Sequence, residues 1–363
     1  TGTVTKQGAG TLTLTGANTY TGATAINAGT LVVGPNSISD ASAVTVGTGA
    51  TLQLAASETI GSLAGAGALD TAGFTLTAGG NNSSTTYSGA ATGTGLTKAG
   101  TGTLTLTGTG TLSGALTAAG GGLTIGTAGA YTAGSAVANA GTFTVGGALT
   151  APVTVASGAT FDVLAGGTST GTVSSVSGST IRVNGTIAGA VTSAGTLTGS
   201  GVINGAVVSS GALRPGTSPG ILRVNGSFAQ TATGVYTAEL TPTATPGTGY
   251  DQVNVTGAAT LAGTLALAPA TGLYVAGTTY DVVVASAGIT GDFTSITGNV
   301  LSPFLSFADT GIVTLTGTQQ AYRLTVARVS YATGLGSGAT PNQIAVANGF
   351  QGGVAGATGD MAT

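Results

Sequence analysis

The sequence predicts an all-β protein: a right-handed parallel β-helix (β-solenoid) with a C-terminal capping module. The first observation is the stretch 97–108, TKAGTGTLTLTG, whose centre alternates threonine with leucine. Leu104 and Leu106 therefore share one face of a strand, and the threonines share the other. The second is a short unit, a glycine and a small residue followed by aliphatic–x–aliphatic, which recurs at a period near 20, as in the 17 residues from Gly141 to Gly158. This period suits one coil of a solenoid and is too short for a propeller blade.

The composition agrees with many short strands and excludes several classes of protein. Charged residues make up 5% of the 363 residues, and the 67 glycines point to tight turns. A mean hydropathy of +0.45 argues against disorder, and no apolar run reaches the roughly 18 residues of a membrane helix. The seven basic residues are dispersed, so no nucleic-acid footprint is visible. Cysteine is absent, which excludes a disulfide framework and thiolate metal sites.

A long-range repeat opens the chain. Residues 5–34 reappear as residues 97–126, so that Lys6 corresponds to Lys98 and Leu12 to Leu104. Both copies predict strand, turn, strand, turn, strand, with the aliphatic side chains filling the interior of the solenoid. Residues 77–95, rich in glycine, asparagine and serine, are predicted to be the largest loop leaving it.

The composition and the pattern change around Pro215, where the predicted strands lengthen and Tyr, Phe, Asp and Arg become commoner. We predict a β-helical shaft over 1–249 and a distinct module over 250–330 that caps it, because the open end of a solenoid is an unpaired edge. Residues 331–363 are predicted to be a linker, in which Thr340 as N-cap and Pro341 could start a helix.

The residue types for catalysis are sparse, and we predict no catalytic, cofactor-binding or metal-binding residues. There is no histidine to activate a serine, and no Asp-x-Asp-x-Asp calcium loop. Asp162 and Arg182, 20 residues apart, could meet on stacked coils, most simply as a surface ion pair. Threonine pairs such as Thr103 and Thr105 match the Thr-x-Thr pattern of an ice-binding face. Uneven coil lengths are expected to break a flat array of such threonines.

Several motifs, in order, resemble those of bacterial autotransporter (type V secretion) passengers. The stretch KQGAGTLTLTGANTYTGATAINAGTLVVG, Lys6–Gly34, resembles the passenger-associated transport repeat, and the copy at Lys98 lacks the NTYTG part. LRPGTSPGILRVNGSFAQ from Leu213 and GYDQVNVTGAATLAGTL from Gly249 resemble the run into a pertactin-like C-terminal module. YDVVVASAGITGDF, Tyr280–Phe293, resembles a later part of that module.

The resemblance implies a β-helical passenger at the surface of, or secreted from, a Gram-negative bacterium, acting as a structural stalk and adhesion surface. The C-terminal module would assist folding during outer-membrane translocation, like an autochaperone; its folding and capping candidates are Tyr250, Asp251, Tyr280, Gly291 and Phe293. The implied partner is a translocating outer-membrane β-barrel absent from this chain, together with an unidentified host-cell, matrix or neighbouring-cell ligand.

No cofactor and no nucleic acid is implied. The chain opens without a signal peptide, so we expect a fragment of a longer precursor. The alternatives are a polysaccharide-acting β-helix enzyme and, less favoured, a threonine-array ice-binding protein.

Overall fold

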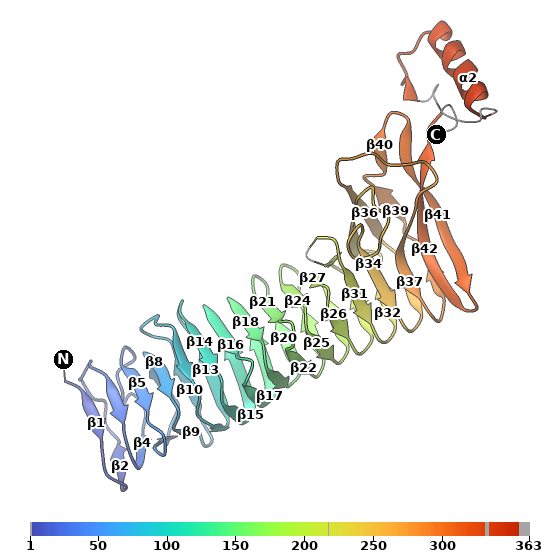
Figure 1. Cartoon of the computed structure of the whole chain (residues 1–363). Helices are drawn as coiled ribbons and strands as arrows, with labels where there is room; N and C mark the ends of the chain where they lie inside the picture. The colour runs from blue at the N-terminus through green and yellow to red at the C-terminus, as the bar shows by residue number, and fades with distance from the viewer. Residues whose placement is uncertain (1, 217, 331–333, 356–363) are drawn as a thin grey trace. The chain divides into compact units, whose positions relative to one another are not determined.

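The chain folds into an all-β parallel solenoid, as predicted (Figure 1). The computed structural model describes residues 2–216, 218–330 and 334–355. The chain divides into two compact units. The N-terminal unit holds residues 1–197 and 201–207, and the C-terminal unit holds residues 198–200 and 208–363. Strands β27 (Thr196–Gly199) and β29 (Val207–Ser209) lie where the two units divide.

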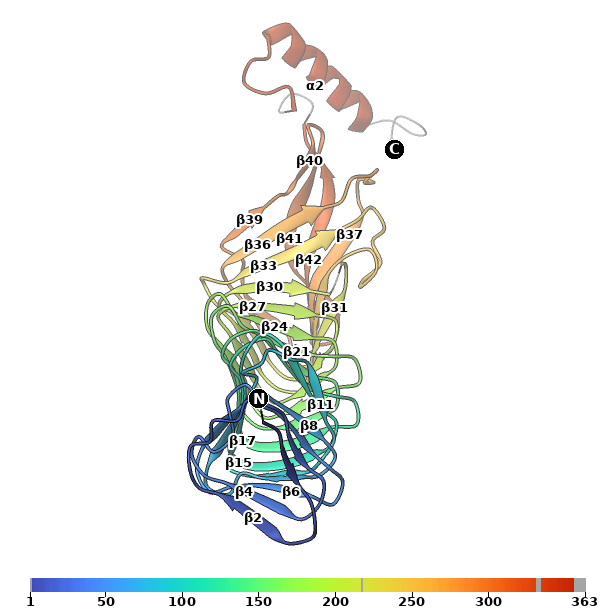
Figure 2. The same ribbon diagram turned by 90° about the vertical axis from the view of Figure 1, so that its left-hand side faces the viewer.

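The N-terminal unit has three rows of parallel strands, one row for each face of the coil. Figure 2 shows strands of successive coils lying over one another. The first row contains β1 (Val4–Lys6), β3 (Thr24–Ile26), β5 (Ala43–Val46), β8 (Ser62–Gly65), β11 (Thr85–Tyr87), β14 (Thr103–Leu106), β16 (Gly122–Ile125), β18 (Thr142–Val145), β21 (Thr160–Val163) and β24 (Thr180–Val183).

The second row contains β2 (Thr11–Leu14), β4 (Thr30–Val33), β6 (Thr51–Leu54), β9 (Ala68–Asp70), β12 (Ala91–Gly93), the first halves of β15 (Thr109–Ala118) and β17 (Ala130–Ala138), β19 (Ala148–Thr150), β22 (Thr168–Thr170), β25 (Thr186–Ala188) and β28 (Val202–Ile203). The third row contains β7 (Glu58–Ile60), β10 (Thr75–Ala78), β13 (Gly95–Lys98), the second halves of β15 and β17, β20 (Val153–Val155), β23 (Val173–Ser175) and β26 (Val191–Ser193).

The core of this unit is a stack of aliphatic and aromatic side chains, because the same strand position points inward in each coil. Leu104 is 2% exposed and Leu106 fully buried, as the alternation predicted. The register places Leu104 beside Leu123 and Phe143 beside Phe161, whose ring centroids lie 5.9 Å apart in an edge-to-face arrangement. Parallel pairing of the coils satisfies the backbone polar groups around this interior.

The two copies of the repeat occupy different rows. In the first copy, the lysine strand β1 lies in the first row and the TLTL strand β2 in the second. In the second copy, the lysine strand β13 lies in the third row and the TLTL strand β14 in the first. The repeat therefore encodes a strand–corner–strand unit that any face of the coil can use.

The prediction of a large loop over 77–95 is wrong. Strands β11 and β12 lie within this stretch and pair with the coils on either side. Its polar residues turn a corner of the coil: Asn82 Oδ1 accepts the Thr101 N–H (2.9 Å), and the Gly80 N–H donates to the Ile60 carbonyl oxygen (3.2 Å).

The C-terminal unit also has three rows of parallel strands, and its last three strands are antiparallel to their neighbours. Its parallel rows are β30 (Ala212–Pro215), β33 (Val235–Leu240), β36 (Thr264–Pro269) and β39 (Ser295–Thr297); β31 (Ile221–Val224), β34 (Gln252–Val255) and β37 (Thr279–Ala285); and β32 (Phe228–Gln230), β35 (Ala259–Leu261) and β38 (Ile289–Gly291). Strand β42 (Gln319–Arg328) pairs antiparallel with β37, β41 (Leu305–Thr316) with β42, and β40 (Val300–Ser302) with β41.

Helix α2 (Pro341–Ala355) begins where the sequence predicts. The Gln343 N–H donates to Thr340 Oγ1 (3.3 Å), and the Thr340 N–H donates to Gln343 Oε1 (2.8 Å). This reciprocal pair is a capping box, which satisfies backbone donors at the helix start. Among the described residues we find no helix with the length and apolar character needed to span a membrane.

The repeat supplies a matched test of the core. Leu104→Ala should lower the free energy of unfolding by about 2–5 kcal/mol, because the side chain leaves a cavity in the stack. Leu12→Ala changes the equivalent residue of the first copy, which is 38% exposed, and should cost about 1 kcal/mol or less. Urea unfolding followed by circular dichroism measures both; equal losses would contradict the assignment of the inward face.

Candidate functional site: the polar and aromatic cluster of the C-terminal unit

Tyr250, Asp251 and Tyr280 lie together where β34 meets β37. Tyr250 and Asp251 directly precede β34, and Tyr280 is the second residue of β37. The rings of Tyr250 and Tyr280 meet edge to face with centroids 5.3 Å apart. The Tyr280 hydroxyl donates to the Thr241 carbonyl oxygen (2.7 Å), so the buried ring keeps a partner for its polar end.

Phe293 and Gly291 lie apart from that group. The Phe293 ring packs against Tyr322 (centroids 4.9 Å apart) and Tyr236 (6.4 Å). Gly291 ends β38 with φ 74°, and a Cβ there would lie 2.3 Å from the Leu261 carbonyl oxygen of the preceding coil. Glycine is therefore required by both backbone conformation and space at this position.

Sequence reasoning missed the aromatic residues that link these groups. The Phe307 ring of β41 lies 5.5 Å from both Tyr280 and Tyr274, edge to face with each. The Tyr236 hydroxyl donates to the carbonyl oxygens of Asp251 (3.2 Å) and Val282 (3.0 Å). The rise in Tyr and Phe after Pro215 was the available signal, but it did not say which rings meet.

Asp251 is a buried carboxylate held by backbone donors of two earlier segments. Its Oδ1 accepts the Gly220 N–H (2.7 Å), and its Oδ2 accepts the Glu239 N–H (3.0 Å). The residue is 1% exposed, and burial raises the pKa of its carboxyl from 3.8 to about 6. The side chain therefore ties β34 to the coil before it.

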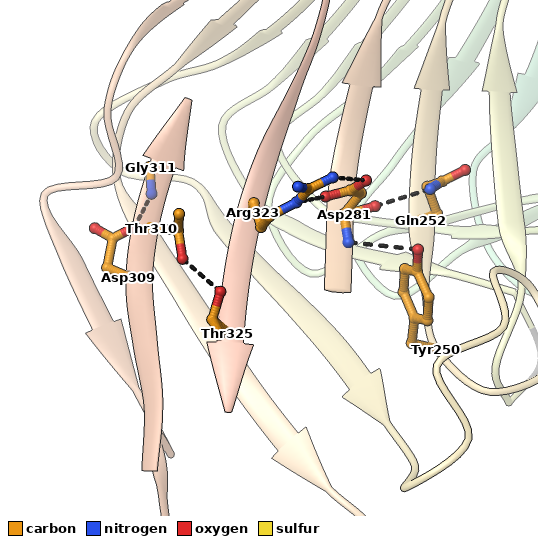
Figure 3. Close-up of polar contacts among 8 residues, drawn as sticks. All are labelled: Tyr250, Gln252, Asp281, Asp309, Thr310, Gly311, Arg323 and Thr325. Carbon is orange, nitrogen blue, oxygen red and sulfur yellow. Dashed lines mark hydrogen bonds and ion pairs between the residues drawn. The ribbon is translucent and has the colours of Figure 1, made fainter. Parts of the chain in front are cut away.

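Asp281 and Arg323 form a two-pronged ion pair between β37 and β42 (Figure 3). Arg323 Nε donates to Asp281 Oδ1 (2.7 Å) and its NH2 group to Oδ2 (2.9 Å). On the other side of β37, Gln252 Nε2 donates to the Asp281 carbonyl oxygen (2.8 Å), and the Asp281 N–H donates to the Tyr250 hydroxyl (3.4 Å). One residue thus links the last parallel strand to the antiparallel hairpin and to the preceding coil.

A further contact holds the two strands of the hairpin. The hydroxyls of Thr310 and Thr325 lie 2.7 Å apart, and Asp309 Oδ1 accepts the Gly311 N–H (2.8 Å; Figure 3). The Thr310–Thr325 contact joins the two strands of the hairpin, whereas the Asp309–Gly311 contact lies within β41. The arrangement is suited to fixing how β37, β41 and β42 pair.

The carboxylates of the described residues do not gather into a metal site. No group of three or more Asp and Glu side chains comes close enough to hold a metal ion within residues 2–216, 218–330 and 334–355. Asp162 and Arg182 do meet, in register on β21 and β24, with Arg182 NH1 3.3 Å from Asp162 Oδ2. The Arg182 side chain is 44% exposed and that of Asp162 12%, so the pair lies at the surface, as the sequence suggested, with its carboxylate largely covered.

The lysines of the two repeats have a structural partner set that the sequence did not reveal. Lys98 is 1% exposed, and its Nζ donates to the carbonyl oxygens of Ala99 and Gly100. Lys6 Nζ donates to the carbonyl oxygens of Gln7 (2.9 Å) and Gly8 (2.6 Å), and also to that of Ala28 (2.9 Å). Burial lowers the pKa of Lys98. Each lysine therefore satisfies backbone carbonyl oxygens at a corner of the coil.

Removing the two-pronged ion pair between Asp281 and Arg323 should destabilise the C-terminal unit. Arg323→Ala leaves a largely covered carboxylate without its partner and should cost about 1–3 kcal/mol of unfolding free energy. Arg223→Ala is the control, because this arginine of β31 in the same unit is exposed, and a surface substitution should change stability by about 0.5 kcal/mol or less. Denaturant unfolding of both variants tests this; an Arg323 loss no larger than that of Arg223 would contradict it.

Asp251 should give the chain a measurable pH dependence of stability. Its folded pKa of about 6 exceeds the ordinary 3.8, so the folded state binds the proton more tightly than the unfolded state. Its contribution is present below pH 4 and is lost as the pH rises from about 4 to about 6. Asp251→Asn lacks this titration, so its unfolding free energy should fall less than the wild type's over that window. Identical slopes in unfolding titrations would overturn the assignment.

Comparison with known protein families identifies the same two repeats that the sequence shows. The passenger-associated-transport-repeat family matches residues 4–33 and 96–125, which are the two copies described above. No curated protein matches the chain. The matched residues form consecutive strands and corners of the N-terminal unit. The chain therefore carries two passenger-associated transport repeats on a parallel β-solenoid, consistent with an autotransporter passenger.

Proposed function

We propose that the chain is a surface-displayed or secreted passenger that acts as a stalk with an adhesive surface, and that its C-terminal unit assists folding. The family implies a partner outer-membrane β-barrel domain in the full protein and a Gram-negative cell surface or secreted location. The antiparallel pairing of β42 with β37 is the observation that carries the folding role. Neither the enzyme nor the ice-binding alternative gains support from the fold or the comparison.

The adhesive role is supported by a neutral, hydroxyl-bearing surface on the N-terminal unit. From residue 99 to residue 161 the chain has no charged residue. Register pairing aligns five exposed threonines in one column across five strands: Thr92, Thr111, Thr132, Thr150 and Thr170. Strand register is kept along this column although the coils differ in length. A regular row of hydroxyls suits many weak hydrogen bonds to a neutral partner.

The folding role is supported by what an uncovered coil would expose. A strand at the end of a parallel stack has a free row of N–H and C=O groups, which pairs readily with other chains. Strand β42 pairs with the edge of β37 that would otherwise be free, and the ion pair between Asp281 and Arg323 joins the two strands. A hairpin built from residues near in sequence forms faster than long-range parallel pairing. It can therefore offer a finished edge on which coils stack.

One experiment tests display and folding together. The chain would be expressed before a translocating β-barrel, with and without residues 305–328, and its surface exposure measured by protease accessibility of intact cells. We expect the wild type to be displayed, and the deletion to be displayed less and to refold more slowly from denaturant, with aggregation. Cells that display the wild type are then scored for aggregation and for adherence to host cells.

The outcomes separate the parts of the proposal. Equal display and equal refolding of the deletion variant would show that the hairpin is no folding aid. A wild-type chain that stays inside the cell would contradict the passenger role. Display without any adherence would contradict the adhesive role and agree with the role as a stalk. Arg323→Ala removes only the ion pair, so its surface display and its refolding rate should lie between those of the wild type and the deletion variant.

A further inference from the structure

Two turns of the C-terminal unit carry apolar side chains that face solvent. Leu273 is 91% exposed, Val300 70%, Val275 68% and Phe304 42%. The first turn joins β36 to β37, and the second surrounds β40, which is labelled in Figures 1 and 2. Residues of both turns, including Leu273 and Val300, line one groove, so the turns lie side by side. We call these four side chains the apolar tip.

Contacts of Tyr274 position the first turn of the apolar tip. The Tyr274 hydroxyl donates to the carbonyl oxygens of Leu240 (2.8 Å) and Ala270 (3.1 Å), and the Tyr274 ring packs on Phe307. With Tyr274 anchored inward, Leu273 and Val275 on either side of it point outward. Their exposure is therefore a consequence of a fixed turn.

Several polar backbone groups of the turns have partners within the protein. Ser302 Oγ accepts the N–H groups of Phe304 (3.2 Å) and Leu305 (3.1 Å). The Val329 N–H donates to the Phe304 carbonyl oxygen (2.8 Å), and the Thr278 N–H to that of Val275 (3.1 Å). Such internal pairing matters most where water is absent, because an unsatisfied backbone group in hydrocarbon costs several kcal/mol.

The two turns themselves contain no charged residue, although the exposed Arg328 pairs opposite Leu305 next to the second turn. Between Asp251 and Asp281, and between Asp292 and Asp309, the sequence has no charged residue. Protein interfaces commonly centre on Trp, Tyr or Arg anchors, whereas the apolar tip projects Leu, Val and Phe. Exposed leucine and phenylalanine beside satisfied turns match the boundary between lipid headgroups and acyl chains.

We propose that the apolar tip is a lipid-contact site, which inserts into the surface of the outer membrane and holds the C-terminal unit against it. The location supports this: Leu305 pairs with Arg328 at the end of β42, so the chain leaves the strands beside Phe304. The inference rests on the proposed function, under which the membrane domain of the full protein follows this exit.

The sequence offers a clean reporter, because it contains no tryptophan. Leu273→Trp places one in the apolar tip, and Leu164→Trp places the control at a 39% exposed site of the N-terminal unit. Each purified chain would be mixed with phosphatidylcholine vesicles that contain lipopolysaccharide. We expect the emission of Leu273→Trp to shift to the blue and to be quenched by brominated acyl chains, with no change for Leu164→Trp.

A second pair of changes tests the chemistry of the contact. Val275→Ser with Val300→Ser, in the Leu273→Trp background, should lower the vesicle partition coefficient at least roughly tenfold, because apolar area no longer leaves water. Added salt should change binding little, since the apolar tip carries no charge. Circular dichroism confirms that the variants are folded.

Three results would overturn the proposal. They are no shift for Leu273→Trp, an equal shift for the Leu164→Trp control, and a shift that grows with protein concentration without vesicles, which would indicate contact between two copies. Cell-surface exposure is measured separately. A chain that is displayed but ignores vesicles overturns the lipid contact alone, whereas one that binds vesicles but is never displayed overturns the proposed function.

Discussion

Backbone hydrogen bonding between successive coils is the constraint on which every other feature depends. A coil of this sequence has too few large side chains to form a core alone, so it must bury its aliphatic stripe against the coils on either side. Parallel pairing keeps equivalent positions aligned, which stacks Leu104, Leu123 and Phe143 inside and leaves the threonines outside. The low charge follows from the same design, because the outward positions need only hydroxyls to stay hydrated.

The same constraint underlies the folding role that we propose for the C-terminal unit. Parallel stacking always leaves a free edge, and a long charge-poor sequence has little else to keep that edge from pairing with another chain. In this unit the chain reverses direction, so that β42 runs antiparallel to β37 and β41 runs antiparallel to β42. The charged and aromatic residues that are scarce elsewhere concentrate at this reversal, where strand direction and register need side-chain contacts to define them.

The chain therefore divides its residues by task. Threonine, glycine and aliphatic residues build coils that are nearly interchangeable, as the shift of the repeat from one row to another shows. Tyrosine, aspartate and arginine make the individual contacts of the C-terminal unit, such as Asp281 with Arg323 and Asp251 with the Gly220 and Glu239 backbone. The first group gives length and a neutral surface, and the second gives a defined end.

The sequence by itself determined what depends on neighbours along the chain. Alternation gave the inward leucines, the period near 20 gave the coil, and Thr340 with Pro341 gave the start of α2, because strand faces and helix caps are set within a few residues. Only the tertiary structure decided which row each repeat occupies, that residues 77–95 form a coil, and that Asp281 meets Arg323, 42 residues away. Those outcomes depend on how corners divide each coil and on where the chain reverses, and both are settled by pairing between segments distant in sequence.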